Sequence, residues 1–190
     1  MRIYKPSFGN IKAFVLTALL CLLLVQAQEA LCQAQQKPEP SRTSESETAQ
    51  SYRLNIDGEV EKALELSSSD LKKLPRRTVK TKDHDGKESN YIGFDLVEVL
   101  KLAGVKFGEG LRGKALALYL VVGAADNYKA VFALPELDPA YTDKIVLLAD
   151  QMDGKPLSTH NGPLQVIVPD EKKHARWVRK VTTLRVLRAE

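Results

Sequence analysis

The stretch SNYIGFDLVEVLKLAG, residues 89–104, decides the fold class because its hydrophobic pattern changes once. Ser89–Phe94 contains the aromatic and β-branched residues that favour a β-strand. From Asp95 to Ala103 the apolar residues recur every three or four positions, which predicts an amphipathic helix that Gly104 ends. A strand that leads directly into a short helix indicates a mixed α/β domain.

The remainder of the domain shows the same change between strand and helix patterns. Ser67 or Ser68 can cap a short helix at Ser69–Leu74, which Pro75 ends. Leu134–Tyr141 contains two prolines and predicts no more than a helical turn. Strands are predicted at Tyr52–Ile56, Ala63–Leu66, Arg76–Lys82, Leu116–Val122, Lys129–Ala133, Ile145–Ala149, Leu164–Val168 and Val181–Leu187. We therefore expect a single α+β domain.

The first 34 residues have the pattern of a signal peptide. Three cations among the first 12 residues precede an apolar run at Ala13–Val25. Small residues then allow cleavage after Ala27 or after Ala34. The apolar run is shorter than the roughly 20 residues of a membrane span, and an uncleaved anchor is the alternative. We expect a periplasmic or secreted protein with no membrane span after cleavage.

Cysteine content and charge restrict the chemistry of the processed chain. Both cysteines, Cys21 and Cys32, lie in the leader, so cleavage after Ala34 leaves no thiol. Zinc ribbons, iron–sulfur clusters and thiol catalysis are therefore excluded from the folded part. Cleavage also removes three cations and one anion, which lowers the net charge from +4 to +2. So small a charge does not indicate nucleic-acid binding.

Residues 35–51 consist mainly of Gln, Pro, Ser, Thr and Glu, with almost no apolar side chains. Such a segment cannot bury enough surface to offset its ordering entropy, so we expect a disordered linker. The folded domain is expected over residues 52–190. Its length of about 140 residues is enough to bury a stable core without disulfides.

Three stretches carry more specific motifs: residues 91–105, 125–137 and 148–178. The third includes HNGPL at residues 160–164 and RWV at residues 176–178. In that order and spacing they resemble the molybdopterin-binding domain of the sulfite oxidase family, especially its small exported bacterial members. The resemblance covers nearly the whole domain. It implies a mixed sheet with short helices that holds a pterin–molybdenum cofactor in a cleft between loops.

The chemistry of that family needs a thiolate, and this chain lacks it. The resemblance places the molybdenum-ligating cysteine just after the strand at Arg76–Lys82, where the sequence reads TVKTKD at residues 78–83. Neither Thr81 nor Lys82 replaces a soft anionic sulfur ligand. The family's Arg-Asn-x-His loop near the domain start is also missing. Gln165 stands where the family often has an arginine for the pterin phosphate.

The resemblance implies four candidate cofactor-binding residues, which are His160, Asn161, Arg176 and Asp126. Three of them have a structural alternative. His160 is also explained by backbone hydrogen bonds within its loop. Arg176 is explained by a solvated position at a strand end beside a buried tryptophan, and Asp126 by a tight turn.

Two polar segments add further alternatives. Asp83-His84-Asp85-Gly86 contains oxygen and imidazole ligands, but it predicts a polar hairpin turn rather than a metal site. A basic cluster at residues 172–180 predicts a solvated edge that discourages strand pairing, with contact to an acidic partner or a phosphate as the alternative. No Ser-His-Asp or Cys-His arrangement can be assembled from the histidines.

Two functional interpretations follow. The missing thiolate favours a degenerate, non-catalytic module that binds an anionic or pterin-like ligand or a protein partner, with no metal and no cofactor required. The alternative is a molybdopterin-dependent oxidoreductase that acts on a small oxo-compound and either binds the cofactor without a cysteine or completes its site with a partner subunit. A secreted partner-binding domain without any small ligand is a third interpretation. Whether the chain is an enzyme stays open at this point.

Overall fold

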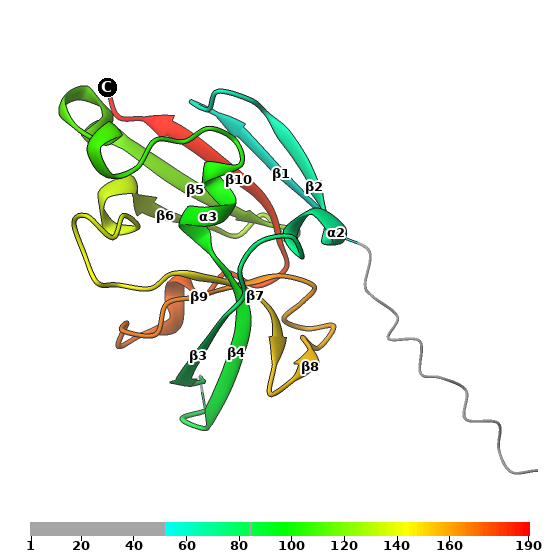
Figure 1. Cartoon of the computed structure of the whole chain (residues 1–190). Helices are drawn as coiled ribbons and strands as arrows, with labels where there is room; N and C mark the ends of the chain where they lie inside the picture. Colours follow the sequence, from blue (N-terminus) through cyan, green and yellow to red (C-terminus); the bar gives the residue numbers. More distant parts are fainter. Residues whose placement is uncertain (1–51, 84) are drawn as a thin grey trace, which may run out of the picture. The chain divides into compact units, whose positions relative to one another are not determined.

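The computed structural model describes residues 52–83 and 85–190, which form two β-sheets and several short helices (Figure 1). This arrangement confirms the α+β fold class. The expected leader and linker, together with His84, lie outside the described residues, so their assignments stay predictions. Among the described helices, none has the length and apolar character needed to cross a membrane.

The first sheet has five strands in the order β2-β1-β10-β5-β6. They are β1 (Arg53–Gly58), β2 (Leu64–Ser67), β5 (Leu118–Ala124), β6 (Lys129–Ala133) and β10 (Val181–Arg188). β1 and β10 are parallel, with Asn55 opposite Thr183, and the other neighbouring strands are antiparallel. The first and last strands of the domain therefore lie side by side in a mixed sheet.

The second sheet is antiparallel, with the order β3-β4-β7-β8 and with β9 also paired to β7. Its strands are β3 (Arg77–Lys82), β4 (Glu88–Asp95), β7 (Leu147–Met152), β8 (Lys155–Pro156) and β9 (Gln165–Ile167). Asp83 closes the β3–β4 hairpin, because its Oδ1 accepts hydrogen bonds from the backbone N–H groups of Asp85 and Lys87. The predicted polar hairpin turn is confirmed.

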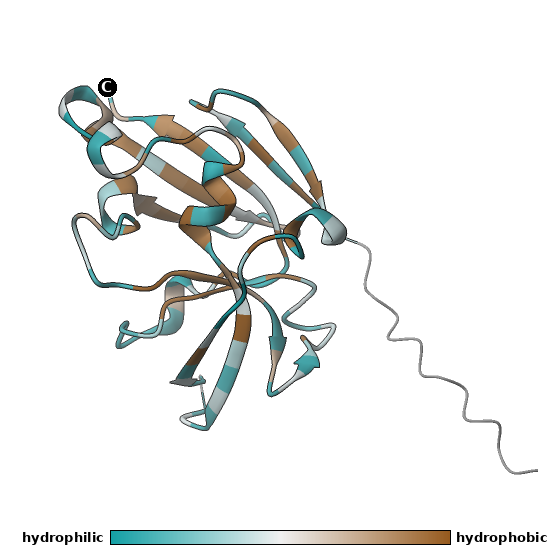
Figure 2. Cartoon of the chain, in the orientation of Figure 1, coloured by the Kyte–Doolittle hydropathy of each residue, from teal (hydrophilic) through white to brown (hydrophobic). Residues whose placement is uncertain are grey.

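The core is built from the alternating faces of these strands. In β10, Leu184 and Val186 are fully buried, while Arg185 between them is exposed, as the two-residue period of a strand requires. Figure 2 shows the hydrophobic residues concentrated along β5 and β10 and on one face of α3 (Leu96–Lys101). Burial of each large apolar side chain contributes about 1.5–3 kcal/mol to folding, before the entropy cost is subtracted.

The two helices are shorter than predicted. α2 (Ser68–Leu71) is capped at its N-terminus by Ser67. The Oγ of Ser67 accepts a hydrogen bond from the backbone N–H of Asp70 at 3.3 Å, and the Asp70 carboxylate accepts one from the backbone N–H of Ser67 at 3.1 Å. α3 ends at Lys101 rather than Ala103, because the next N–H groups bond three residues back rather than four.

The strand boundaries also differ from prediction in one informative place. Leu116 was expected in a buried strand, but it lies in the 3₁₀ turn η2 (Gly113–Ala117) and is 44% exposed. β5 begins only at Leu118. A short apolar run does not by itself reveal which of its residues begins the strand. The remaining 3₁₀ turns are η1 (Gly108–Gly110), η3 (Leu134–Glu136) and η4 (His174–Arg176).

Candidate functional site

A cavity of about 1340 Å³ is formed by segments of the domain that are distant in sequence. Its wall consists of the β3–β4 hairpin, the loop after β8, strand β9, the turn before β6 and the segment at residues 169–179. Figure 1 shows the hairpin, β9 and the η4 region gathered below the first sheet. Cavities of this kind are where small ligands bind in most proteins, and this one exceeds the roughly 300–1,000 Å³ of a typical ligand site.

The loop after β8 brings His160 and Asn161 to the cavity wall. The backbone N–H of Gly162 donates to the carbonyl of Ser158 at 2.7 Å and closes a tight turn. The backbone N–H of Lys180 donates to the carbonyl of Asn161 at 2.9 Å, which fixes this turn to the residue before β10. Two of the four predicted site residues therefore lie in the cavity wall, on one fixed loop.

His160 is hydrogen bonded to Arg179, another residue of the wall, with Arg179 Nη1 2.7 Å from His160 Nε2. A guanidinium has only N–H donors, so Nε2 accepts and the imidazole carries its proton on Nδ1. Within residues 52–83 and 85–190, Arg179 makes no other side-chain hydrogen bond, so its remaining N–H groups can meet an anionic ligand.

Trp177 anchors an aromatic part of the wall. Its indole N–H donates to the carbonyl of Val168 at 2.9 Å. The imidazole of His174 stacks on the indole with ring centroids 3.9 Å apart, and Tyr91 meets the indole edge-on at 5.5 Å. Burial raises the pKa of Tyr91 above its ordinary value. Tyr91 and Trp177 are buried and His174 is half-buried, so the stacked imidazole is the part of this ring cluster that faces the cavity.

Asp126 lies in the turn between β5 and β6, outside the cavity wall. Its Oδ1 accepts from the backbone N–H of Tyr128 at 3.0 Å, and Asn127 has the positive φ of 69° that such a turn uses. The neighbour Tyr128 does line the cavity, and its hydroxyl donates to the carbonyl of Ala175 at 2.6 Å. The geometry thus gives Asp126 a role in shaping the turn.

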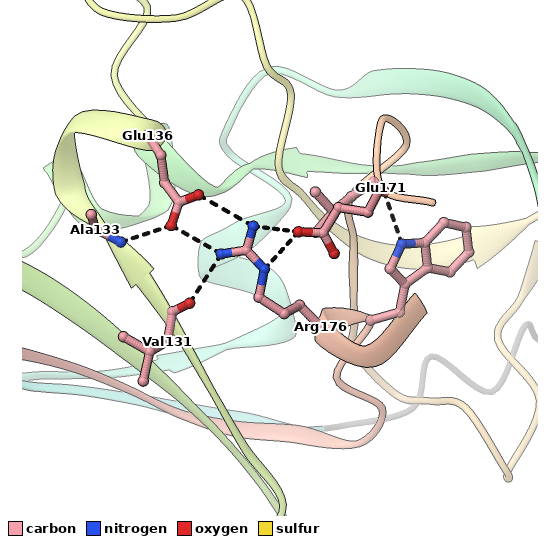
Figure 3. A network of polar contacts seen from close by, with 7 residues as sticks. Val131, Ala133, Glu136, Glu171 and Arg176 are labelled. Carbon is pink, nitrogen blue, oxygen red and sulfur yellow. Dashed lines mark hydrogen bonds and ion pairs between the residues drawn. The ribbon is translucent and has the colours of Figure 1, made fainter. Parts of the chain in front are cut away.

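Arg176 also lies outside the wall, bound by two carboxylates (Figure 3). Its Nη1 lies 2.9 Å from Glu136 Oε1, its Nε lies 2.6 Å from Glu171 Oε1, and Nη1 also donates to the carbonyl of Val131. The guanidinium stacks over Phe132 at 4.4 Å. Burial lowers its pKa, but the two glutamates more than compensate and raise it above the ordinary value. Arg176 is therefore ion-paired rather than solvated, and its contacts fix η4 to β6. Its contact with a ligand stays a prediction.

Gln165 combines deep burial with a place in the cavity wall. The residue is 3% exposed, and its Oε1 has no hydrogen-bond partner among the described residues. Strand β9 holds it rigidly, because Gln165 pairs with Ala149 of β7 and the next residue, Val166, donates to the carbonyl of Val178. Buried amide oxygens are nearly always hydrogen bonded, so an orphaned one at a cavity needs an explanation.

The charges of the wall favour an anion. The cationic residues are Lys82, Lys172, Lys173 and Arg179, and the anionic residues are Asp83, Asp85 and Glu171. Glu171 shares the single positive charge of Arg176 with Glu136, and Asp83 accepts two backbone hydrogen bonds in the hairpin turn. The segment at residues 172–179 therefore presents a net positive surface to the cavity.

Sequence reasoning gave ligand contact by this segment only as the alternative to a solvated edge. The basic cluster at residues 172–180 was expected to be a solvated strand edge, but it precedes β10 and forms the η4 region. Four of its members line the cavity: Lys172, Lys173, His174 and Arg179. The charge density was visible in the sequence, but the cavity that it faces depends on the distant β3–β4 hairpin.

Residues 41–190 match the family model of the oxidoreductase molybdopterin binding domain. The chain belongs to this family. The resemblance expected from the motifs is thereby confirmed. A comparison with curated proteins gave no match.

The fold of this molybdopterin-binding domain is shared with a solved structure, the sulfane dehydrogenase SoxCD from Paracoccus pantotrophus. The two superpose with a TM-score of 0.57 and 24% sequence identity, over 72% of this chain and 38% of that chain. At this identity the likeness concerns the fold alone. This chain spans well under half the length of that protein.

The cavity wall of this molybdopterin-binding domain fits only part of the family's cofactor. The cations of the wall and the stacked imidazole of His174 suit a planar anionic heterocycle. Thr81 and Lys82, at the position expected to ligate molybdenum, do lie in the wall, but neither supplies a thiolate. The sulfur of the wall belongs to Met152, a neutral thioether. The residues present therefore do not fit the metal, and no step through it is derived.

Proposed function

We propose that this chain is a non-catalytic, extracytoplasmic binding module whose cavity holds an anionic, pterin-like small molecule without coordinating molybdenum. One observation carries the proposal. Thr81 and Lys82, the positions expected to provide the metal thiolate, are part of a cavity wall that also carries the cations Lys172, Lys173 and Arg179. A site without a thiolate for the metal but with cations that attract an anion is suited to binding rather than to redox chemistry.

Each part of the wall has a stated task in this proposal. Arg179, oriented by His160, donates to the anionic group of the ligand. The imidazole of His174, held by its stacking on Trp177, covers a planar ring system. The Glu136–Arg176–Glu171 contacts hold the η4 region in place.

The extracytoplasmic location belongs to the proposal and rests on the signal-peptide pattern of residues 1–34. A protein partner is included as a second binding function, since a ligand-loaded module outside the cytoplasm needs a recipient or a signalling target. Sequencing the N-terminus of the natively expressed protein tests the location: a new terminus at Gln28 or Gln35 supports export, and an intact Met1 contradicts cleavage.

A second candidate function is a molybdopterin-dependent oxidoreductase that binds the cofactor without a cysteine or takes its metal donor from another subunit. Membership in an oxidoreductase domain family favours it. The activity in the name of the SoxCD structure is not transferred, because this chain covers 38% of that protein. Co-purification of a partner with a molybdenum-loaded complex distinguishes this function from the first.

The binding proposal is tested by identifying what the native protein carries. Protein purified from its native host is denatured, and the released small molecules are analysed by fluorescence and mass spectrometry. We expect an anionic heterocycle in close to equimolar amount. Re-addition at about 100 times its Kd should stabilise the emptied protein by nearly 3 kcal/mol. If no ligand is released and anionic heterocycles cause no thermal shift, the partner-binding interpretation without a small ligand is favoured instead.

A further inference from the structure

The second sheet ends in an edge strand whose outer backbone groups are open. β3 is the terminal strand of the order β3-β4-β7-β8 and, among the described strands, pairs only with β4 (Figure 1). The backbone N–H of Asp83 donates to the carbonyl of Lys87 at 2.8 Å, so every second residue counted back from Asp83 bonds to β4 in this antiparallel ladder. The residues between them, Thr78, Lys80 and Lys82, therefore direct their N–H and C=O groups away from β4.

The opposite strand confirms this direction. Asn90 stands opposite Lys80, and both of its backbone groups bond to Asp153, which follows β7 on the other side of β4. The Asn90 N–H donates to Asp153 Oδ1 at 2.8 Å, and the Asn90 carbonyl accepts from the Asp153 N–H at 2.8 Å. Within residues 52–83 and 85–190, no backbone group outside the sheet bonds the outward groups of β3.

The other edges of the two described sheets are closed or short. On β6, Arg176 Nη1 donates to the carbonyl of Val131 at 3.1 Å, and Glu136 Oε1 accepts from the N–H of Ala133 at 2.8 Å, so side chains occupy these edge groups (Figure 3). β2, β8 and β9 have four, two and three residues, whereas β3 has six. Native proteins usually shorten or cover an edge strand, so an open edge of this length is a candidate site for strand addition.

The charges of β3 select what can pair with it. The strand carries three cations and no anion, and Lys80 and Lys82 are exposed. Pairing with β3 of a second copy, centred on Lys80 or Thr81, places lysine opposite lysine, which destabilises the ladder, whereas an acidic strand places carboxylates there. Lys80 is paired with Glu88 at 2.8 Å, but both side chains are more than half exposed, so this pair contributes little and leaves the lysine accessible.

We propose that the outer edge of β3 is a docking site for an extended acidic segment of a partner protein, which adds to the second sheet as a further strand. The backbone of the segment bonds the outward groups of Thr78, Lys80 and Lys82, and its carboxylates meet the two lysines. Thr81 and Lys82 also line the cavity, so the added strand lies at the cavity rim. The inference goes beyond ligand binding and assigns a surface to the protein partner.

The test uses peptides with blocked ends as probes, and protein expressed from the full chain. TEVEVET is the acidic strand, and TKVKVKT has the opposite charge. The third probe is TEVEVET with each glutamate N-methylated, which keeps the charge but removes the N–H groups that would face β3 when glutamate stands opposite Lys80. Fluorescence anisotropy measures the affinities, and hydrogen exchange followed by NMR measures the protection of each amide.

The protein variants separate backbone pairing from charge. Thr78→Pro removes an outward N–H and leaves the bonds to β4, since proline is accepted where an edge strand faces solvent. Lys80→Glu reverses the central charge and keeps the backbone, so it remains informative if the proline variant does not fold. The control Lys114→Glu makes the same charge change at an exposed residue of η2, outside β3 and the cavity wall. Circular dichroism and melting temperature verify the folding of each variant.

Strand addition predicts an alternating pattern along β3. Wild type should bind TEVEVET about tenfold or more tightly than either other peptide. Binding should protect the amides of Thr78, Lys80 and Lys82 and leave those of Val79 and Thr81, already bonded to β4, nearly unchanged. Both β3 variants should weaken TEVEVET by about fivefold or more, the lysine-to-glutamate variant should gain affinity for TKVKVKT, and the control should behave as wild type.

Several results would overturn the inference. Equal binding of TEVEVET and its N-methylated form would show charge attraction without strand addition. Absence of binding by wild type, or protection that does not alternate along β3, would overturn it as well. Protection of the outward amides before any peptide is added would mean that the edge is already covered, by a second copy if it rises with protein concentration and by the same chain if it does not. Ligand release and re-addition test the cavity separately, so the proposed function stands or fails independently.

Discussion

Arg179 Nη1 lies 2.7 Å from His160 Nε2, and this bond joins the loop after β8 to the segment before β10. Because arginine cannot accept, His160 acts as the acceptor that orients the guanidinium. The substitution His160→Phe should therefore weaken binding of neopterin monophosphate about three- to tenfold, the equivalent of one lost hydrogen bond. His160→Gln keeps an acceptor oxygen and should retain most of the affinity. Equal losses in both variants, measured by titration calorimetry, would show that the acceptor does not matter.

The ion pairs of Arg176 predict a stability effect. Arg176→Gln leaves Glu136 and Glu171 without their partner in a region where all three side chains are less than a third exposed. We expect a loss of about 2 kcal/mol in the free energy of unfolding, less than for a fully buried pair because water screens part of the interaction. Urea denaturation measures it. The control is Arg53→Gln, whose pair with Glu65 is largely exposed and should contribute below about 1 kcal/mol. Similar losses in the two variants would contradict a special role for Arg176.

The boundary of β5 can be tested with two leucines. Leu184 is fully buried in β10, and Leu184→Ala should cost about 2–5 kcal/mol. Leu116 is 44% exposed in η2, so Leu116→Ala should change the unfolding free energy by no more than about 0.5 kcal/mol. Thermal or urea unfolding of both variants gives the comparison. A large loss in Leu116→Ala would place this residue in the core and move the start of the strand.

The cap of α2 predicts an acid-dependent effect. Hydrogen bonds from Ser67, and after them the ion pair with Lys73, hold the pKa of Asp70 well below its ordinary value. A carboxylate whose pKa is lower in the folded state stabilises the fold above its unfolded pKa of about 3.9 and loses that contribution as the pH falls below it. The stability difference between wild type and Asp70→Asn should be constant from pH 5 to 7 and shrink below pH 4. A difference that does not change with pH would contradict the role of the charge.

Much of the fold could be predicted from the sequence because the strands have regular alternation. Leu184 and Val186 face the core on either side of an exposed Arg185, and that two-residue period is visible without coordinates. The exact ends of the helices and strands were harder to predict from the sequence. The end of α3 at Lys101 depends on a change to shorter hydrogen bonds, and the two-residue β8 has too few residues to carry any pattern.

The site was only partly predictable, for a physical reason. His160 and Asn161 lie in the wall as their motif indicated. Arg176 does not, because nothing in the local sequence shows whether a cation beside a tryptophan faces a cavity or a glutamate forty residues earlier. The orphaned oxygen of Gln165 is a property of three-dimensional packing, so it appears only once β9 and its neighbours are assembled.

The molybdenum content of the natively expressed protein tests the central claim most directly. Elemental analysis is performed on protein purified from its host, with a molybdoenzyme from the same cells as a control for metal supply. Because Thr81 and Lys82 stand where a thiolate would be needed, we predict far less than one molybdenum atom per chain while the control is fully loaded. A ratio close to one atom per chain, retained through purification, would contradict the binding-module account.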